Sequence, residues 1–402
     1  FILISLFVLP ANARRRSLDE EKVINEIWAR TDMPEFKNYK IEEQYKNEPV
    51  VILARYQEFI GNVKVAYMGG QMPCRGKEFY RNLIMINDNS AIRQFSTIEY
   101  VNNTATSKQV VGIRVIKNDG SVVEINPNDY IKISTDLNNR RKKNNITKIA
   151  VPNLQKGDVI DYFIYEEEEM YYNQFRHFYI NDNAPIQSYR FHGAFDYGVM
   201  TDTWYWLPDN IKATEQRDES EKRTLLDFNL KNIDKKNREV MSSPFKNNPR
   251  FRFVFASLES GSKCKDIFPK HEYGLHRKTK EEGMLVNKVF NEYDFFNYMS
   301  YSTAGAINKE LKKYFDQHPG LSDKQKADEI YNYLATCWIR HGHSFNSDNK
   351  AFFCTFRTLL RAFKIPVYYG IAMERNFGDR KDALVASDFD KIIKLKDGTF
   401  YE

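Results

Sequence analysis

The sequence predicts an α+β protein, in which a mostly antiparallel β-sandwich over residues 40–240 precedes a separate unit of helices and strands over 295–402. In the first region, short β-branched and aromatic runs alternate with turn residues, a pattern typical of a sandwich. In the second region, apolar residues recur at helical spacing before short strand-like runs. With 402 residues, 42% of them hydrophobic, the chain can bury more than one core.

The clearest element of the first region is a hairpin. Its strands are predicted over 110–116 and 121–125, with Asp119 and Gly120 in the turn between them. Asp-Gly supplies the positive φ angle that a tight hairpin turn needs. Further strands are predicted at 50–54, 62–66, 149–151, 159–165, 189–195 and 203–207. The stretch 241–294 is predicted to be an irregular linker, because three prolines punctuate it.

Two helices are predicted in the second region. Ser322 and Gln325 form a capping box at the start of the first helix, and an apolar stripe follows. The second helix is predicted to begin at Cys354, because apolar residues recur on one of its faces: Phe356, Leu359, Leu360 and Phe363. A cysteine at a helix N-terminus lies at the positive end of the helix dipole, which favours the reactive thiolate.

A cysteine hydrolase also needs an imidazole that accepts and returns the proton. The seven histidines all precede Cys354, at positions 177, 192, 271, 276, 318, 341 and 343. His341 or His343 could approach Cys354, since only a loop separates them from it. Otherwise the base lies beyond residue 402, or the site does not perform the chemistry that its layout suggests.

The second region resembles a transglutaminase-like domain, a papain-like fold in which Cys, His and Asp follow one another along the chain. The resemblance rests on the helix that begins at Cys354, the phrase Arg361-Ala-Phe-Lys-Ile-Pro366 and the strand-like run 367–373. It implies cysteine-based acyl transfer or amide hydrolysis, with Cys354 as the nucleophile. It also places Lys391 where the family has His, and Glu402 near the expected Asp. The Gly that commonly precedes the nucleophile is replaced, since the chain reads Phe-Phe-Cys.

The first region resembles a bacterial domain of unknown function that precedes transglutaminase-like domains in exported proteins of Gram-negative bacteria. Three phrases carry this resemblance, at 89–95, 116–124 and 148–162. They imply an N-terminal β-domain followed by a papain-like, transglutaminase-type α+β domain. They imply no chemistry for the β-domain itself.

The start of the chain predicts export. Residues 1–9 are apolar but too few to span a bilayer as a helix, and Ala11-Asn-Ala13 resembles a cleavage site before three arginines. Residues 1–13 are therefore predicted to be a signal-peptide remnant, and the protein to be periplasmic or secreted. No other run approaches a membrane span.

The composition and the spacing of the cysteines and histidines indicate neither nucleic-acid binding nor a bound cofactor. The net charge of +6 is modest, and basic runs such as 140–143 are expected to be solvated loops. The cysteines at 74, 264, 337 and 354 have no metal-like spacing, although a pair could form a disulfide. His341 and His343 alone do not define a zinc site, so no metal is expected. The acidic run 166–169 is expected to be a solvated strand end.

Three functions remain open. The sequence favours an exported, non-catalytic interaction or scaffold protein with a protein or peptide partner, because Lys391 stands at the expected His position. The first alternative is an active cysteine peptidase-like or amide-transfer enzyme acting on protein or peptidoglycan peptides. The second is a carbohydrate-binding β-domain, in which Trp204 and Trp206 share one face of a strand and form a platform; core packing would explain the same pair.

Overall fold

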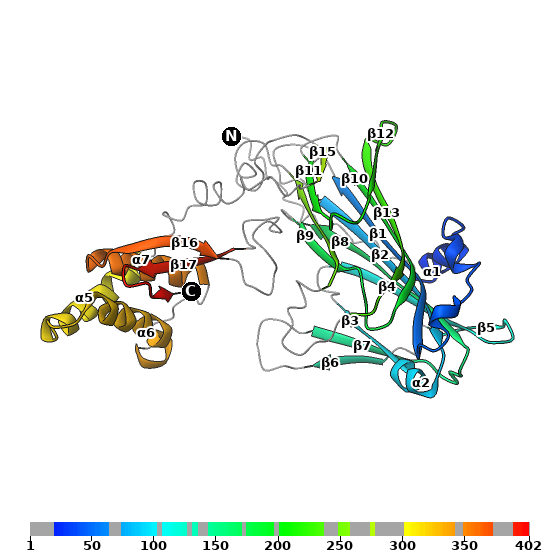
Figure 1. The fold of residues 1–402 in the computed structure, drawn as a ribbon, viewed down its shortest axis with the longest axis horizontal. Helices are drawn as coiled ribbons and strands as arrows, with labels where there is room; N and C mark the ends of the chain where they lie inside the picture. Colours follow the sequence, from blue (N-terminus) through cyan, green and yellow to red (C-terminus); the bar gives the residue numbers. More distant parts are fainter. Residues whose placement is uncertain are drawn as a thin grey trace, which may run out of the picture.

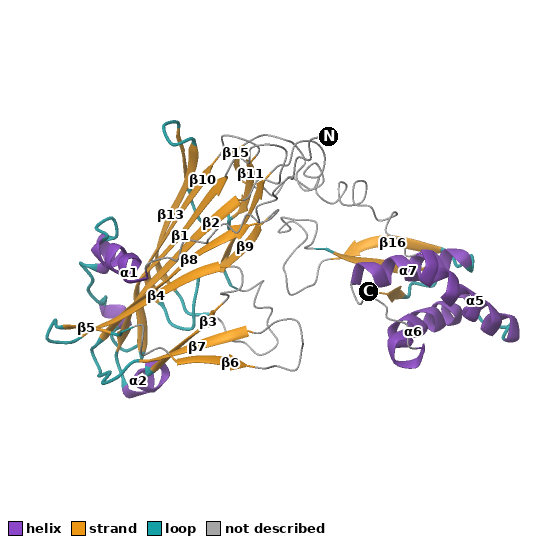
Figure 2. Cartoon of the chain, turned by 180° about the vertical axis from the view of Figure 1, so that it is seen from behind, coloured by secondary structure: helices purple, strands orange, loops and turns teal. Residues whose placement is uncertain are grey.

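The computed structural model describes residues 20–63, 74–102, 107–126, 131–135, 144–170, 174–196, 201–236, 248–257, 274–277, 301–341, 349–372 and 389–401. The predicted signal-peptide remnant lies outside these residues. The described chain is a mixed α+β protein, mostly of β-sheet with few helices (Figures 1 and 2). Two hydrophobic clusters lie in the β-rich part, and a third, which shares no residue with them, lies among the C-terminal helices.

An eight-stranded sheet is the largest element. Its order is β12-β13-β10-β1-β2-β8-β4-β5, and within it only β1 and β10 run parallel. The bounds are β1 Val50–Val63, β2 Cys74–Ile86, β4 Ser107–Ile116, β5 Val122–Glu124, β8 Val159–Met170, β10 Ile186–Asp196, β12 Thr214–Asp218 and β13 Arg223–Ile233. The mostly antiparallel pairing agrees with the sequence prediction.

A four-stranded sheet covers one face of the large sheet. Its order is β15-β11-β14-β9, with bounds β9 Gln174–Tyr179, β11 Thr201–Trp206, β14 Arg250–Ser257 and β15 Gly274–Arg277. Aromatic rings fill the space between the sheets: Phe59 lies 4.6 Å from Phe253, and Phe191 lies 4.6 Å from Phe251. The two sheets therefore form a sandwich with an aromatic core.

The predicted linker over 241–294 needs correction, because β14 and β15 lie within it. Phe251 and Phe253 are fully buried in the sandwich core. Arg250 and Arg252 alternate with them along β14. The prolines of this segment obscured an alternating strand pattern that completes the second sheet.

A three-stranded sheet, β3-β7-β6, closes one side of the same core. Its bounds are β3 Thr97–Asn102, β6 Ile131–Thr135 and β7 Asn144–Ala150. The short helix α2, Asn89–Phe95, leads into it and is capped by Asp88, whose side chain accepts a hydrogen bond from the backbone N–H of Ala91.

Two of the three phrases that carry the resemblance of the β-domain, 116–124 and 148–162, meet in space. Lys117 donates hydrogen bonds to Asp158 and to the backbone oxygen of Asn153. Gly120 has a φ of +84°, as predicted for the hairpin turn. Gly157, at φ +92°, donates its backbone N–H to Ile86. The turn at Gly120 and the turn at Gly157 are thus held against each other by hydrogen bonds at one end of the large sheet.

The N-terminal segment covers the other face of the large sheet. It contains α1 (Glu20–Ala29) and the short 3-10 helices Pro34–Phe36 and Glu43–Tyr45. Trp28 of α1 lies over a buried ion cluster, in which the Asp161 carboxylate accepts hydrogen bonds from Arg81 at 2.7 and 2.8 Å and from Arg114 at 2.9 Å. The Arg114 guanidinium carbon is 4.1 Å from the Trp28 ring.

The described residues of the C-terminal part form three helices and a small sheet. The bounds are α5 Tyr301–Gln317, α6 Asp323–His341, α7 Asn349–Ala362, β16 Val367–Ala372, β17 Asp390–Leu395 and β18 Phe400–Tyr401. The predicted capping box is present, since Gln325 Oε1 accepts the Ser322 N–H at 2.9 Å. None of the described helices is long and apolar enough to cross a membrane.

The face under the N-terminal segment also holds a histidine–carboxylate pair. His192 of β10 and Asp227 of β13 are register partners, and Nδ1 lies 2.8 Å from Oδ1. The hydrogen bond with Asp227 raises the pKa of His192, against the opposing effect of burial. Glu58 raises it further, and Arg190 lowers it. A raised folded-state pKa adds stability below the unfolded value, and this stability is lost as pH rises through the folded value.

We therefore expect the His192–Asp227 contribution to unfolding free energy to fall as pH rises from about 6 to about 8, around the ordinary histidine value of about 6.5. The effect should be below about 1 kcal/mol, because the pair is partly exposed. Urea titrations of the parent, His192→Gln, Asp227→Asn and the double variant would measure the coupling. A coupling energy that is the same at pH 6 and pH 8 would refute this assignment.

Candidate functional site

Cys354 does not begin a helix. The helix α7 starts five residues earlier, at Asn349, so the cysteine lies in its second turn. Phe352 and Phe353 account for the difference, because they extend the apolar stripe of α7 toward its N-terminus: the Phe352 ring lies 6.3 Å from Phe356, and Phe353 is buried. The dipole effect is confined to the first turn of a helix, and Cys354 lies beyond that turn.

The thiol of Cys354 is free and almost enclosed. The residue is 5% exposed, and neighbouring Thr355 is 7% exposed. The backbone oxygen of Cys354 accepts a hydrogen bond from Thr358 Oγ1 at 2.8 Å, within the helix. Cys354 is therefore buried, and a substrate would need to open this part of the unit to reach the sulfur.

The other predicted site residues are only partly described. Lys391 lies in β17, where its backbone pairs with Ile371 of β16. The same strand carries Ile393 into the core that also holds α7. The side chain of Lys391, Glu402 and His343 lie outside the described part of the chain, as does the side chain of His341. The structure thus places the backbones of Cys354 and Lys391 in elements that share one core, and it leaves their side-chain geometry undescribed.

His318 is the one histidine of the C-terminal unit whose side chain is described. It lies just beyond α5, where its Nδ1 is 2.9 Å from the backbone oxygen of Tyr314 and its ring stacks on Tyr314 at 4.3 Å. Both residues are exposed. This geometry fixes His318 at the end of α5 and offers no contact with Cys354 among the described residues.

A tyrosine–carboxylate contact joins the small sheet to the helices. Tyr401 of β18 donates its hydroxyl proton to Asp328 of α6 at 2.7 Å, and Lys324 pairs with the other carboxylate oxygen at 2.7 Å. The Tyr401 ring also packs 5.1 Å from Phe356. Burial and then the bond to Asp328 raise the pKa of Tyr401, which keeps the phenol neutral. Sequence reasoning missed this contact, since the two residues are 73 positions apart.

Trp204 and Trp206 form neither an open platform nor part of the aromatic core. Tyr205 points into the core between them, so the tryptophans lie on the opposite face of β11. Trp204 is only 8% exposed and packs 5.0 Å from His276. The guanidinium carbon of Arg250 lies 5.6 Å from the centre of the Trp206 ring. A sugar ring could not stack on Trp204 in this arrangement.

The acidic run on β8 is also not a solvated strand end. Glu168 of β8 pairs with Arg176 of β9, which also pairs with Glu78 of β2, so Arg176 joins the two sheets. Glu167 lies 3.6 Å from Arg75. Burial raises the pKa of Glu78, while Arg176 opposes that effect. Glu166, Glu167 and Glu168 are thus half-buried, and the last two pair with arginines.

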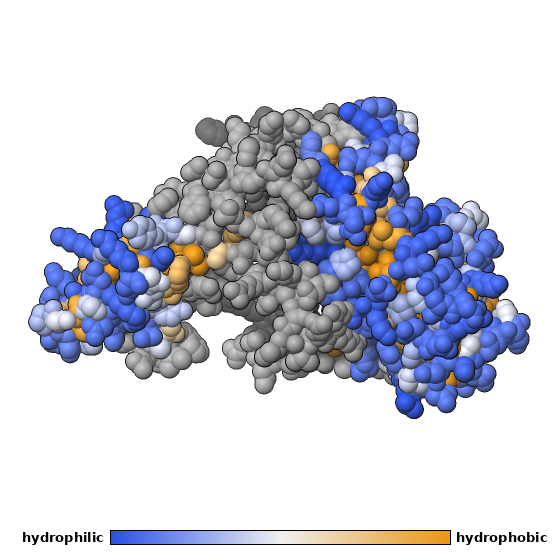
Figure 3. All heavy atoms as spheres, in the orientation of Figure 1, coloured by the Kyte–Doolittle hydropathy of each residue, from blue (hydrophilic) through white to orange (hydrophobic). Residues whose placement is uncertain are grey.

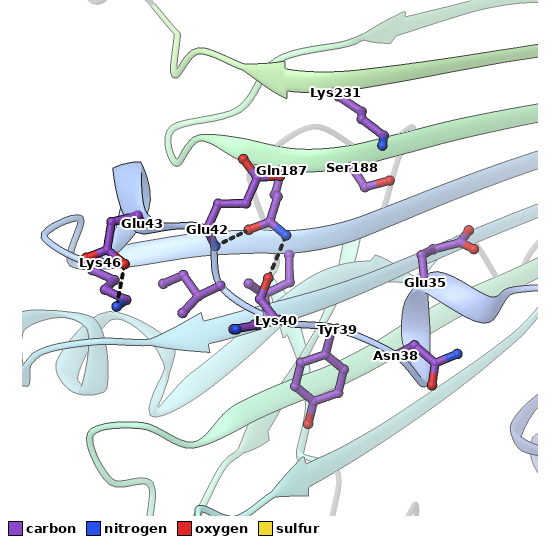
Figure 4. Close-up of a pocket in the computed structure, with 12 residues that line it drawn as sticks. Glu35, Asn38, Tyr39, Lys40, Glu42, Glu43, Lys46, Gln187, Ser188 and Lys231 are labelled. Atoms are coloured by element: carbon purple, nitrogen blue, oxygen red, sulfur yellow. Dashed lines mark hydrogen bonds and ion pairs between the residues drawn. The ribbon is translucent and has the colours of Figure 1, made fainter.

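A cavity of about 610 Å³ lies beneath residues 38–46 (Figure 4). Gln187 of β10 fixes this segment, because its side chain accepts the N–H of Glu42 at 3.0 Å and donates to the backbone oxygen of Lys40 at 2.8 Å. Both charge signs line the cavity, and Lys46 pairs with Glu43 at 2.6 Å. This mixed lining points to no single class of ligand.

These features define an α+β protein with a β-sandwich unit and a helical unit. Residues 74–236 match the family model of a domain of unknown function with a solved structure, DUF3857. The sequence resemblance of the first region to a domain of unknown function agrees with this match. No protein of curated function matches the sequence.

Solved structures give a fold match. A candidate protease from Parabacteroides distasonis is similar with a TM-score of 0.58 at 10% identity, over 88% of this chain and 66% of that one. At this identity the match shows the fold alone, and the chain spans about two thirds of that protein. An M1 zinc metallopeptidase from Deinococcus radiodurans reaches a TM-score of 0.24 at 7% identity, over 52% of this chain and 42% of that one.

The burial of Cys354 predicts slow reaction with a thiol reagent. In a variant whose other cysteines are serine, native Cys354 should react at least about tenfold more slowly than an exposed cysteine, because reaction requires local opening. The matched control keeps these serines and combines Cys354→Ala with Lys394→Cys, since Lys394 is exposed in the same unit. Urea should abolish the difference. Equal rates in the native proteins would show that Cys354 is accessible.

Proposed function

We propose that this chain is an exported, non-catalytic protein that binds a protein or peptide partner and carries a degenerate transglutaminase-like unit. The single observation that carries the proposal is the position of Cys354, which is 5% exposed in the second turn of α7. In this position the thiol has neither the helix dipole nor access to substrate. The order of α7 followed by the antiparallel strands β16, β17 and β18 supports the transglutaminase-like assignment.

Acyl transfer needs one group to activate the thiol and to protonate the leaving amine. In the transglutaminase-like arrangement an imidazole performs both tasks. At the corresponding strand position this chain has Lys391. An ordinary lysine is protonated near pH 7, so it supplies charge but does not cycle a proton. Lys391 therefore supports a binding role for this unit more than a catalytic one.

A cysteine peptidase is the competing function. Its support is the fold shared with the candidate protease from Parabacteroides distasonis. The two functions differ in one requirement, since a peptidase must expose the Cys354 thiol and bring a base to it. Export is proposed for either function, on the apolar run 1–9 and the small residues 11–13 that precede Arg14.

The test is an activity comparison among three proteins. The parent, Cys354→Ala and Lys391→His would be assayed for peptide hydrolysis and for glutamine-to-amine transfer. We expect no turnover by the parent above the Cys354→Ala background. Turnover by the parent that disappears in Cys354→Ala would refute the non-catalytic assignment and support the peptidase. Activity that appears only in Lys391→His would confirm that position 391 is the lost base.

A further inference from the structure

A groove separate from the cavity beneath residues 38–46 lies between α1 and the β4–β5 end of the large sheet. Its volume is about 540 Å³, within the range of known ligand sites. Figures 1 and 2 show α1 beside this end of the sheet. The groove belongs to the β-rich part, so its binding is independent of whether Cys354 is inert.

The floor of the groove is apolar. Ile24 and Trp28 of α1 and Ile125 after β5 line it and are half-buried. Trp28 is held firmly, because its ring meets Phe163 edge-on at 4.8 Å and Arg114 lies 4.1 Å from it. The floor is therefore preformed, which reduces the entropy cost of binding.

The rim of the groove is acidic. Glu20 and Glu21 of α1 and Glu124 of β5 are exposed, and no basic residue lines the groove. Two of these carboxylates, Glu20 and Glu21, lie in the first turn of α1, where the helix dipole stabilises negative charge. It does not account for Glu124.

The arginine opposite Glu124 is already engaged. Arg114 is the register partner of Glu124, but its guanidinium binds Asp161 at 2.8 Å. An acidic groove in a chain of net charge +6 runs against the overall charge, which sets it apart from the general surface of the protein.

The apolar surface continues along the edge strand. β5 is the last strand of the sheet, and its residues Val122 and Val123 are 50% and 49% exposed. Val122 lies two positions from Glu124, so both side chains share one face of β5. An exposed apolar side chain, that of Val122, thus lies beside the Glu124 carboxylate on this edge.

From these observations we infer that the groove binds an extended, lysine- or arginine-containing peptide segment of a partner protein. The aliphatic stems of lysine or arginine fit an apolar floor, and their charged ends reach carboxylates at a rim. Glu20, Glu21 and Glu124 would meet the cationic ends, while Trp28 and Ile24 would contact the stems. Charge complementarity excludes an acidic segment at the same place.

Fluorescence anisotropy with a labelled heptapeptide tests this directly. The probe alternates lysine with valine and threonine, and the comparison peptide has glutamate at each lysine position. We expect the parent chain to bind the lysine peptide and to show no binding of the glutamate peptide. The affinity for the lysine peptide should fall at higher salt. Equal binding of both peptides, or no binding of the lysine peptide, would overturn the assignment.

Matched variants locate the site. Glu20→Gln, Glu21→Gln and Glu124→Gln combined should weaken binding about tenfold, as expected for three partly exposed ion pairs. The control combines Glu221→Gln, Asp316→Asn and Glu329→Gln, which removes three exposed charges elsewhere and should leave affinity within about twofold. Similar losses of affinity in both triple variants would indicate a nonspecific charge effect and would refute the groove as the binding site.

A photo-crosslinking version of the lysine peptide provides a readout that does not depend on the variants. Crosslinks should map to residues 20–28 or 112–126, which contain the groove. Crosslinks confined to other parts of the chain would place the peptide elsewhere and contradict the proposal.

Discussion

The arrangement of the β-rich part depends on a single buried carboxylate. Asp161 is fully buried, and it joins Arg81 of β2 to Arg114 of β4 across the strand β8 that lies between them. The Arg81 contact is bidentate, which adds geometric specificity to the charge pairing. Removing one member of such a cluster leaves an uncompensated buried charge, at a cost of about 3–5 kcal/mol.

The same cluster fixes the position of α1. Trp28 covers both guanidinium groups, with Arg81 at 5.1 Å and Arg114 at 4.1 Å from its ring. Phe36 adds a second aromatic face at 4.4 Å from Arg81. Burial of the ions therefore requires the N-terminal segment, and the segment in turn forms one wall of the acidic groove. Stability of the sheet and shape of the groove follow from one set of contacts.

The C-terminal unit is held by different forces. Its core is aliphatic and aromatic, and the bond from Tyr401 to Asp328 ties the last strand to α6. Cys354 is buried between two members of this core along α7, Phe353 and Phe356, and is itself 5% exposed. Its burial is consistent with the proposed loss of catalysis, since a nucleophile must instead face a cleft.

Local features of the fold could be predicted from the sequence. The Asp119-Gly120 turn needs a positive φ angle, and the Ser322–Gln325 capping box is set by residues three positions apart. The start of α7 could not be placed, because Phe352 and Phe353 suit the helix as well as the loop expected before Cys354. Strand β14 was obscured by the prolines of 241–294, although its buried phenylalanines alternate with arginines that are themselves 2% exposed.

Contacts between distant residues were beyond sequence reasoning. Arg81 and Asp161 are 80 positions apart, and nothing in either local pattern selects the partner. The pairing of Glu168 with Arg176 depends likewise on how β8 and β9 lie in two different sheets. The acidic groove combines α1, β4 and β5, so it exists only once the sheet has formed.

Hydrogen exchange of an Asp161→Asn variant would test most directly whether the ion cluster holds α1 in place. The account predicts that amide protection in α1 falls toward that of an unfolded segment, while protection in α7 stays at the parent level. The matched control is Asp196→Asn, which removes the carboxylate that accepts Arg223 at 2.9 Å near one end of β10 and should leave α1 protected. Parent-level protection of α1 in Asp161→Asn would contradict the central role of the cluster.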